Sequence, residues 1–353
     1  MQPELGIIEG FYGKPWSWEA RAETVSFLAP YGYRFYLYAP KFDQHLRRRW
    51  QEPHPDALAA RLKSLCTHCR ETGVRFGIGL TPFELYDLDS NARSALADKL
   101  QLIDDIGAED LGILFDDMRG DVPDLAKKQI SIVEWAAAHT RATRIIVCPS
   151  YYSDDPVLDR VFGDRPKSYL EDLGSGIDEK IEMFWTGEEV ISREFSPGHL
   201  DRVTDQLKRK PFLWDNYPVN DGGRMSQYLH IRGFTGRPSS NAGRIAAHGI
   251  NPALQPTLNR IPAITLSDSY RQRESYEYGE SFRRACAEVL GPDLGAKVRQ
   301  DLLNLQDIGL DRLGDKEKLL RERYAGVKHP GAEEIVAWLD GAYRITDEIV
   351  QTG

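Results

Sequence analysis

Eight short apolar runs, separated by longer stretches of mixed polarity, occupy residues ~4 to ~265 of the 353-residue chain. Most of these runs lack polar alternation, which is typical of strands covered on both faces in a parallel sheet. The intervening stretches 55–73 and 91–107 are amphipathic, and each closes on a glycine, as is common at a helix C-cap. The apolar runs are LGIIEGF, FYLYAP, RFGIGLTP, LGILFDDM, RIIVCPSY, IEMFWTG, PFLWDNYP and GRIAAHGI.

This alternation predicts an α/β fold of the (β/α)8 or TIM-barrel type, since eight strands with their helices typically occupy about 250 residues. The competing architecture is a doubly wound open sheet, which usually carries G-x-G-x-x-G after its first strand. The first run is instead followed by EGFYGKPWSW. After about residue 270 the pattern is helical with little strand between. We therefore expect a barrel over residues 1–268 and a C-terminal helical region over residues 269–353.

The bulk composition excludes several classes of protein. A net charge of -9 argues against non-specific nucleic-acid binding, which needs a basic surface. No apolar run approaches the roughly 18 residues of a membrane helix, so no membrane association is expected. The start, MQPELGIIEG, lacks a basic and apolar leader, which favours a cytoplasmic protein. Cys66 and Cys69 form one isolated pair, which indicates reduced thiols on a helix rather than a zinc site.

Polar and aromatic residues follow most of the predicted strands. In a (β/α)8 barrel, reacting groups lie at the C-terminal ends of the strands, so these side chains should converge on one rim. Aromatic faces beside carboxylates and amides suit a sugar, although a single tryptophan is usually core and an asparagine near proline is usually a turn former. The rim residues are Glu9, Gly10, Tyr12, Lys41, Asp43, Asp116, Asp117, Tyr151, Tyr152, Trp185, Thr186, Trp214, Asp215, Asn216, Tyr217, Asn220, Asp221 and Asn251.

Asp116 and Asp117 are adjacent at the end of the run LGILFDDM. A carboxylate-nucleophile glycosidase needs two carboxyls about 5–5.5 Å apart flanking the bond, and an inverting one about 6.5–9.5 Å. Adjacent strand residues have Cα atoms about 3.8 Å apart and opposed side chains, so the pair suits neither. It suits a reaction in which the acetamido oxygen of the sugar is the nucleophile, one carboxyl orients that amide and the other protonates the leaving oxygen. Repulsion within the pair should raise the pKa of one member and keep it protonated as the acid.

Two other interpretations of the pair stay open at this level. One or both aspartates could cap the helix expected over DVPDLAKKQ, although Asp121 or Asp124 could do so instead. Asp116, Asp117 and Asp121 also resemble a divalent-ion cluster, but the histidines are scattered and no H-x-H follows the first strand.

Seven segments together resemble glycoside hydrolase family 84, the O-GlcNAcase and β-N-acetylglucosaminidase family. They are GIIEGFYGKPW, YLYAPKFD, LFDDM, CPSYY, FWTGEEV, WDNYPVND and NPALQP, in family order over about residues 5 to 265. The resemblance implies a (β/α)8 barrel and retaining, substrate-assisted removal of β-linked N-acetylglucosamine through an oxazoline, with no metal and no cofactor. One departure is Phe42, where the family commonly has a second acidic residue after the lysine.

The resemblance also implies a role for each matching residue. Asp116 would orient the acetamido N–H, and Asp117 would be the general acid and then the general base. Tyr152, Trp214 and Asn216 would surround the acetamido group. The remaining substrate-binding residues would be Gly10 and Lys41 at sugar hydroxyls, Asp221 and Asn251 at the 4- and 6-hydroxyl end, and Tyr12, Thr186 and Val190 in the wall.

The expected activity is therefore exo-hydrolysis of an N-acetylglucosamine-containing glycoside or glycoprotein. A hyaluronidase-like or chitooligosaccharide-active hydrolase would use the same chemistry and stays open. So does a non-catalytic glycan-binding barrel, which the intact aspartate pair disfavours.

Two surface features are also interpreted from the sequence. The charge run HLRRRW, with Arg47 to Arg49, is expected to be a solvated loop rather than a contact to acidic aglycones. The stretch AEEIVAWLDGAYRITDEIV, 332–350, could form a homodimer face or pack on the barrel.

Overall fold

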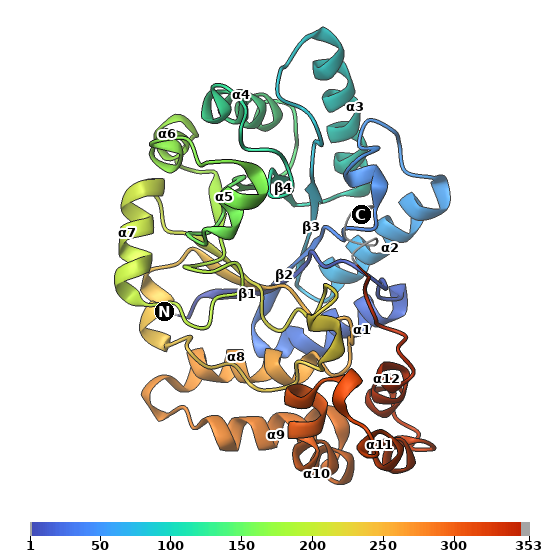
Figure 1. Cartoon of the computed structure of the whole chain (residues 1–353). Coiled ribbons are helices and arrows are strands. Elements are labelled where there is room, and N and C mark those ends of the chain that lie inside the picture. The colour runs from blue at the N-terminus through green and yellow to red at the C-terminus, as the bar shows by residue number, and fades with distance from the viewer. Residues whose placement is uncertain (1, 347–353) are drawn as a thin grey trace.

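The computed structural model describes residues 2–346, and eight parallel strands in it close into a barrel in chain order (Figure 1). The predicted (β/α)8 fold is confirmed. Each predicted run overlaps one strand, and in every case except β8 the last residues of the run lie in the following loop. The strands are β1 Glu4–Glu9, β2 Tyr33–Tyr38, β3 Arg75–Leu80, β4 Asp110–Leu114, β5 Arg144–Cys148, β6 Glu182–Trp185, β7 Phe212–Asp215 and β8 Ala247–Ile250.

Helices cover the outside of the barrel on every connection but one. The two helices with glycine stops form as expected; α3 begins after Asp89, whose side chain accepts from the Ala92 amide, and ends at Gly107 with φ 92°. Within the described chain, the β7–β8 connection holds only short 3₁₀ turns, η3 Met225–Gln227 and η4 Ser239–Gly243. The helices before β8 are α1 Trp18–Leu28, α2 Asp56–Glu71, α3 Ser90–Ile106, α4 Leu125–Ala137, α5 Val157–Phe162, α6 Tyr169–Gly176 and α7 Pro197–Leu207.

The barrel interior is packed with side chains, so the barrel is not a pore. Phe35, Phe184 and Phe212 lie in edge contacts along its axis. At the N-terminal ends of the strands, Arg75 and Arg144 form ion pairs with acidic residues and close that end. The strand ends that carry the rim residues are therefore the open end of the barrel.

The C-terminal helices lie on the side of the barrel where the helix that follows β8 packs (Figure 1). Ile335 and Trp338 of the last helix are buried, and Glu334 accepts from the amides of Thr257 at 2.8 Å and Leu258 at 2.9 Å. The apolar face considered for a homodimer is thus packed within the chain over 332–346, and its residues 347–350 lie outside the described chain. These helices are α8 Arg260–Gln272, α9 Tyr278–Leu290, α10 Pro292–Gln300, α11 Lys316–Tyr324 and α12 Pro330–Leu339.

Three remaining expectations concern the whole chain. The boundary placed after residue 268 falls inside α8, and the division into two domains stays a prediction. Cys66 and Cys69 lie on α2 as buried free thiols. None of the helices formed by residues 2–346 is long and apolar enough to cross a bilayer.

Candidate active site

Asp116 and Asp117 lie in a turn directly after β4, which ends at Leu114. The expectation that their side chains point to opposite faces is wrong, because the extended backbone has already ended. Both carboxylates contact one ammonium: Lys41 Nζ is 2.6 Å from Asp116 Oδ2 and 2.7 Å from Asp117 Oδ2. Since both reach the cavity from one turn, they cannot flank a glycosidic bond from opposite sides. The argument against a carboxylate nucleophile therefore holds for a different reason.

The two carboxyls have unequal environments. Burial raises the pKa of Asp116 above its ordinary value, and Lys41 only partly offsets it. Burial acts on Asp117 as well, but Lys41 and Arg47 outweigh it and hold the pKa of that carboxyl below its ordinary value. Repulsion from Asp117 contributes to the raised pKa of Asp116, whereas the sequence argument had expected the raised pKa on the member that acts as the acid. Asp117 therefore has more cationic and hydroxyl partners than Asp116.

Asp116 keeps one oxygen without a partner. Its Oδ1 is buried, and no atom of residues 2–346 hydrogen-bonds to it. A buried carboxylate oxygen that has no donor is costly unless a ligand supplies one. This oxygen therefore marks a place where a substrate N–H or O–H would be bound.

The burial of Arg47 corrects the main error of the sequence analysis. The charge run HLRRRW was expected to be a solvated loop, but Arg47 is only 4% exposed. Its Nη2 donates to Asp117 Oδ2 at 3.1 Å. Arg49, in contrast, is exposed and pairs with Glu52. Nothing in the spacing of the run distinguishes the inward-facing arginine from its neighbours.

The end of β7 forms one side of the cavity. Trp214 Nε1 donates to Asn216 Oδ1 at 3.1 Å, and Asn251 Nδ2 donates to the same oxygen at 3.0 Å. Asn216 Nδ2 in turn donates to the Val190 carbonyl at 2.8 Å. The Gly10 amide lies 3.3 Å from Asn251 Oδ1, which joins the end of β1 to this chain of contacts. These hydrogen bonds connect the ends of β1, β6, β7 and β8 around the Trp214 ring.

Tyr12 connects the aspartate pair to the opposite side of the cavity. Its hydroxyl donates to Asp117 Oδ2 at 3.1 Å, and its amide donates to Asp221 Oδ2 at 2.8 Å. Burial raises the pKa of Asp221 to about 6. A half-buried carboxylate that accepts from a backbone amide has unused acceptor sites, which suit sugar hydroxyls.

The two tyrosines after β5 point in different directions. Tyr152 lines the cavity, and burial followed by Asp117 and Asp116 raises the pKa of its hydroxyl well above the ordinary value, so it stays a donor. Tyr151 is fully buried elsewhere, and its hydroxyl donates to the Gly163 carbonyl at 2.6 Å. Thr186 also lines the cavity, and its amide donates to the Tyr152 carbonyl at 2.9 Å. The choice of Tyr152 over Tyr151 agrees with this placement.

One cavity of about 250 Å³ brings all twelve expected site residues together. Pockets for drug-sized ligands are typically about 300–1,000 Å³, so this one is of a size for a single sugar residue. Four further residues line it that the sequence analysis did not select, and no sequence signal distinguished them. The expected residues are Gly10, Tyr12, Lys41, Asp116, Asp117, Tyr152, Thr186, Val190, Trp214, Asn216, Asp221 and Asn251; the others are Cys148, Ile191, Val219 and Gly222.

The alternative roles for the aspartates find no support in the geometry. The N-cap of α4 is Asp124, not Asp116 or Asp117. Asp121 is turned to the exposed Arg119. In the described part of the chain, no three His, Cys, Asp or Glu side chains are grouped to hold a metal ion.

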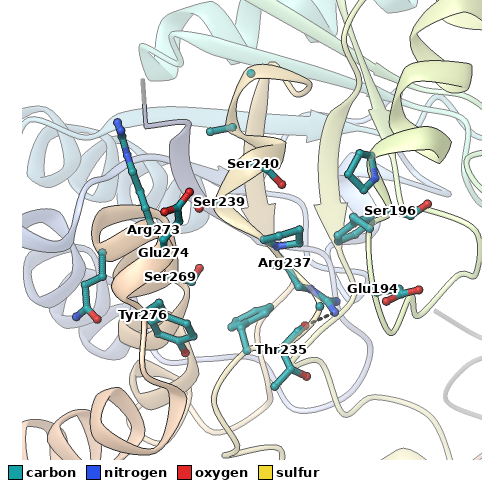
Figure 2. A pocket seen from close by; sticks show the side chains of 18 of the residues that line it. Glu194, Ser196, Thr235, Arg237, Ser239, Ser240, Ser269, Arg273, Glu274 and Tyr276 are labelled. Carbon is teal, nitrogen blue, oxygen red and sulfur yellow. Dashed lines mark hydrogen bonds between the residues drawn. The ribbon is translucent and has the colours of Figure 1, made fainter.

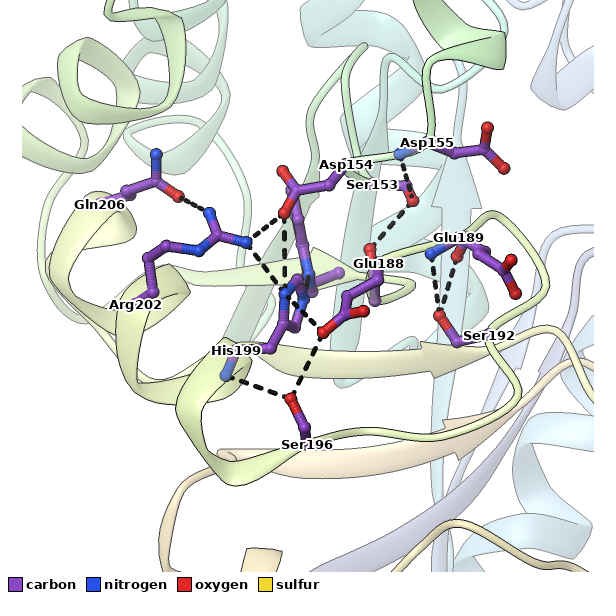
Figure 3. A network of polar contacts seen from close by, with 12 residues as sticks. Ser153, Asp154, Asp155, Glu188, Glu189, Ser192, Ser196, His199, Arg202 and Gln206 are labelled. Atoms are coloured by element: carbon purple, nitrogen blue, oxygen red, sulfur yellow. Dashed lines mark hydrogen bonds and ion pairs between the residues drawn. The ribbon is translucent and has the colours of Figure 1, made fainter.

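A polar network behind the cavity holds the loop that follows β6 (Figure 3). His199 lies near the start of α7. Its Nδ1 is 3.6 Å from Asp154 Oδ2 and 3.6 Å from Glu188 Oε1. Burial lowers the pKa of His199, so its neutral form is favoured. The network joins the β5 and β6 loops, and it supports the segment that carries Thr186 and Val190.

A larger cavity, about 1230 Å³, lies elsewhere (Figure 2). It is on the outside of the barrel, between the start of α7, the β7–β8 connection and the end of α8. Arg237 lines it, but its guanidinium is engaged by Asp215 at 2.7 Å. None of the expected site residues borders this cavity, so volume alone would identify the wrong place.

Comparison with known proteins agrees with the resemblance. The family described as beta-N-acetylglucosaminidase matches residues 5–307. Protein O-GlcNAcase of Mus musculus is 28% identical over 276 residues, which cover 75% of this chain and 30% of the mouse protein; the Rattus norvegicus protein gives the same values. The chain thus matches about a third of the length of these curated relatives.

A solved structure covers more of the chain. A mutant of the O-GlcNAc hydrolase of Thermobaculum terrenum superimposes with a TM-score of 0.79 and is 26% identical. The match covers 98% of this chain and 82% of that chain. The similarity therefore includes the C-terminal helices as well as the barrel.

Proposed function

The chain belongs to the beta-N-acetylglucosaminidase family, and from this premise we propose that its cavity removes terminal β-linked N-acetylglucosamine by a retaining, substrate-assisted reaction. The observation that carries the proposal is the unpartnered Asp116 Oδ1 beside Asp117 in a cavity of a size for one sugar. The acetamido N–H of the sugar would supply the hydrogen-bond donor that this oxygen lacks. A binding protein would gain nothing from a second carboxyl beside it, which disfavours a non-catalytic barrel.

In the first step, the acetamido oxygen attacks the anomeric carbon and the glycosidic bond breaks. Asp117 gives its proton to the leaving oxygen. Asp116 accepts a hydrogen bond from the acetamido N–H and stabilises the positive charge that develops on the oxazoline. Tyr152 donates to the oxygen that becomes part of that ring, and Trp214 packs against the acetamido methyl group.

In the second step, Asp117 takes a proton from water, and the water attacks the anomeric carbon as the oxazoline opens. Two displacements at one carbon restore the original configuration. Because one carboxyl is acid in the first step and base in the second, its pKa must rise as the glycoside binds and fall as the aglycone leaves. A sugar that excludes water and competes for the hydrogen bonds of Lys41 raises the pKa of Asp117 and so allows it to be protonated.

The proposed aglycone is a serine or threonine side chain of a protein or peptide, as the mouse relative's name, protein O-GlcNAcase, suggests. A cavity of about 250 Å³ holds the terminal sugar only, which favours exo-cleavage. Hyaluronidase-like or chitooligosaccharide cleavage would need further sugar subsites outside it. A panel that compares O-GlcNAc-modified peptides with chitobiose at equal concentration distinguishes these substrates.

Turnover of an aryl N-acetyl-β-glucosaminide, followed by proton NMR of the released sugar, tests the reaction itself. We expect the β-anomer to appear first and to mutarotate later. First release of the α-anomer, or a covalent glycosyl ester trapped on the protein, would contradict the proposal. No turnover by folded protein would favour the binding-protein alternative.

A further inference from the structure

Arg47 is a buried cation directed at one member of the aspartate pair. It is 4% exposed, its Nη2 lies 3.1 Å from Asp117 Oδ2, and its guanidinium carbon lies 5.6 Å from the centre of the Tyr12 ring. Its Nη1 also donates to the Lys41 carbonyl at 3.4 Å. Asp116, which also contacts Lys41, receives no hydrogen bond from this guanidinium in the described chain. The arginine therefore makes the two carboxylates unequal.

The turn that carries Arg47 is fixed from a separate helix. Lys99 of α3 is 1% exposed, and its ammonium donates to the carbonyls of His45 at 3.0 Å and Glu52 at 2.5 Å. Asp43 begins the turn by accepting from the His45 amide at 3.1 Å. These contacts hold the turn on both sides of Arg47. The fold thus places the Arg47 guanidinium next to Asp117.

A purely structural role explains this arrangement poorly. Burying a guanidinium is unfavourable, and one ion pair seldom offsets it. Lys41 already gives both aspartates a cationic partner. A second buried cation on Asp117 alone has a specific effect, which is to favour the ionised form of that carboxyl over the neutral one.

On the basis of the function proposed above, we propose that Arg47 is a positioning residue for the second half of the reaction: it fixes the Asp117 carboxyl and stabilises the carboxylate that must take a proton from water. Lys41 is then free to exchange partners as the sugar binds, while Arg47 stays on Asp117. The acid form exists only while the intact glycoside shields the pair. The base form returns as soon as the aglycone leaves.

Removing the charge of Arg47 should therefore raise the pKa of Asp117. The ionisable groups that face this carboxyl are Lys41, Arg47, Asp116, Asp221, Tyr12, Tyr152 and Cys148. Among them, Lys41 and Arg47 are the cations that lower the pKa of Asp117. An adjacent opposite charge commonly shifts a carboxyl by about 1–3 units. Loss of one of two such charges should shift it by about one unit upward.

The experiment measures kcat, which reports the enzyme–substrate complex, against pH for the wild type, Arg47→Met and Arg47→Lys on an aryl N-acetyl-β-glucosaminide with a poor leaving group. We expect the alkaline limb of Arg47→Met to move upward by about one pH unit, and Arg47→Lys to restore most of the wild-type position. Arg49→Met is the matched control, since Arg49 lies on the same turn but is exposed and paired with Glu52. Its profile should match that of the wild type.

A merely structural Arg47 would lower activity by the same factor at every pH, and such a uniform loss would overturn the inference. An unshifted limb in an active variant would also overturn it. If Arg47→Met does not fold, Arg47→Gln and Arg47→Lys give the same comparison of neutral and charged side chains. Failure of the wild type to hydrolyse the glycoside would instead refute the proposed function, so the two failures are distinguishable.

Discussion

The Trp214 indole packs so closely over Gly10 that a methyl group on Gly10 would lie 2.3 Å from carbon Cζ2 of the ring. No real side chain tolerates that contact, so the glycine is what lets the indole lie across the end of β1. We expect Gly10→Ala to displace Trp214 and to lower kcat/KM by roughly 10- to 100-fold, since overpacking commonly costs about 1–3 kcal/mol.

The matched control for this change is Gly198→Ala on α7. A methyl group there meets nothing within 4 Å, and alanine is the better helix residue. Steady-state kinetics should therefore be unchanged in Gly198→Ala. An unaffected Gly10→Ala enzyme would show that the indole is not held in its place by this contact.

Asp117→Ala tests the acid role. General acid–base catalysis typically contributes about 10²–10⁴-fold, and this contribution depends on how poor the leaving group is. We expect a loss of that size on O-GlcNAc peptides and a smaller loss on activated aryl glycosides, whose leaving group needs no proton. Asp121→Ala, which removes an exposed carboxylate from the same loop, is the control and should leave both rates unchanged. Equal losses on the two substrate types in Asp117→Ala would exclude the acid role.

Arg237, which lines the larger cavity, forms a buried ion pair with Asp215 at the end of β7. Two guanidinium nitrogens contact the carboxylate at 2.8 and 2.7 Å, and His248 Nε2 lies 3.0 Å from it. Removing one partner of a buried ion pair typically costs about 3–5 kcal/mol of stability. We expect the free energy of unfolding of Arg237→Met, measured with urea, to be lower by about that amount. Arg244→Met, which breaks an exposed pair with Asp201 on the same connection, should lose less than about 1 kcal/mol. Similar losses in the two variants would argue against the importance of the buried pair.

The sequence predicts those parts of the site that directly follow strands, since a barrel brings all strand ends to one rim. Periodicity could not show that β4 ends at Leu114, and this is why the orientation of Asp116 and Asp117 was misjudged. Arg47 was missed for a different reason: its burial depends on Lys99, which contacts the turn from a distant helix. A contact of this kind has no local pattern. A buried lysine within an amphipathic helix is the one signal that could have pointed to it.

Glu334 gives a test of how α12 is held, away from the reaction. Its carboxyl is buried, accepts from the amides of Thr257 and Leu258, and has a pKa raised by burial from 4.5 to about 6. The neutral form is therefore the one that the fold favours. The stabilisation from this neutral form is complete below about pH 4.5 and is lost as the pH rises through about 6.

Because the side chain of glutamine does not titrate, Glu334→Gln removes this pH dependence. We expect the difference in unfolding free energy, wild type minus Glu334→Gln, to fall by about 2 kcal/mol between pH 4.5 and pH values well above 6. Urea unfolding at a series of pH values measures it, and kinetics at the pH optimum should change little, since Glu334 does not line the cavity. A difference that is constant across this range would mean that the carboxyl titrates alike in the folded and unfolded chain. Burial against the barrel would then not control the titration of Glu334.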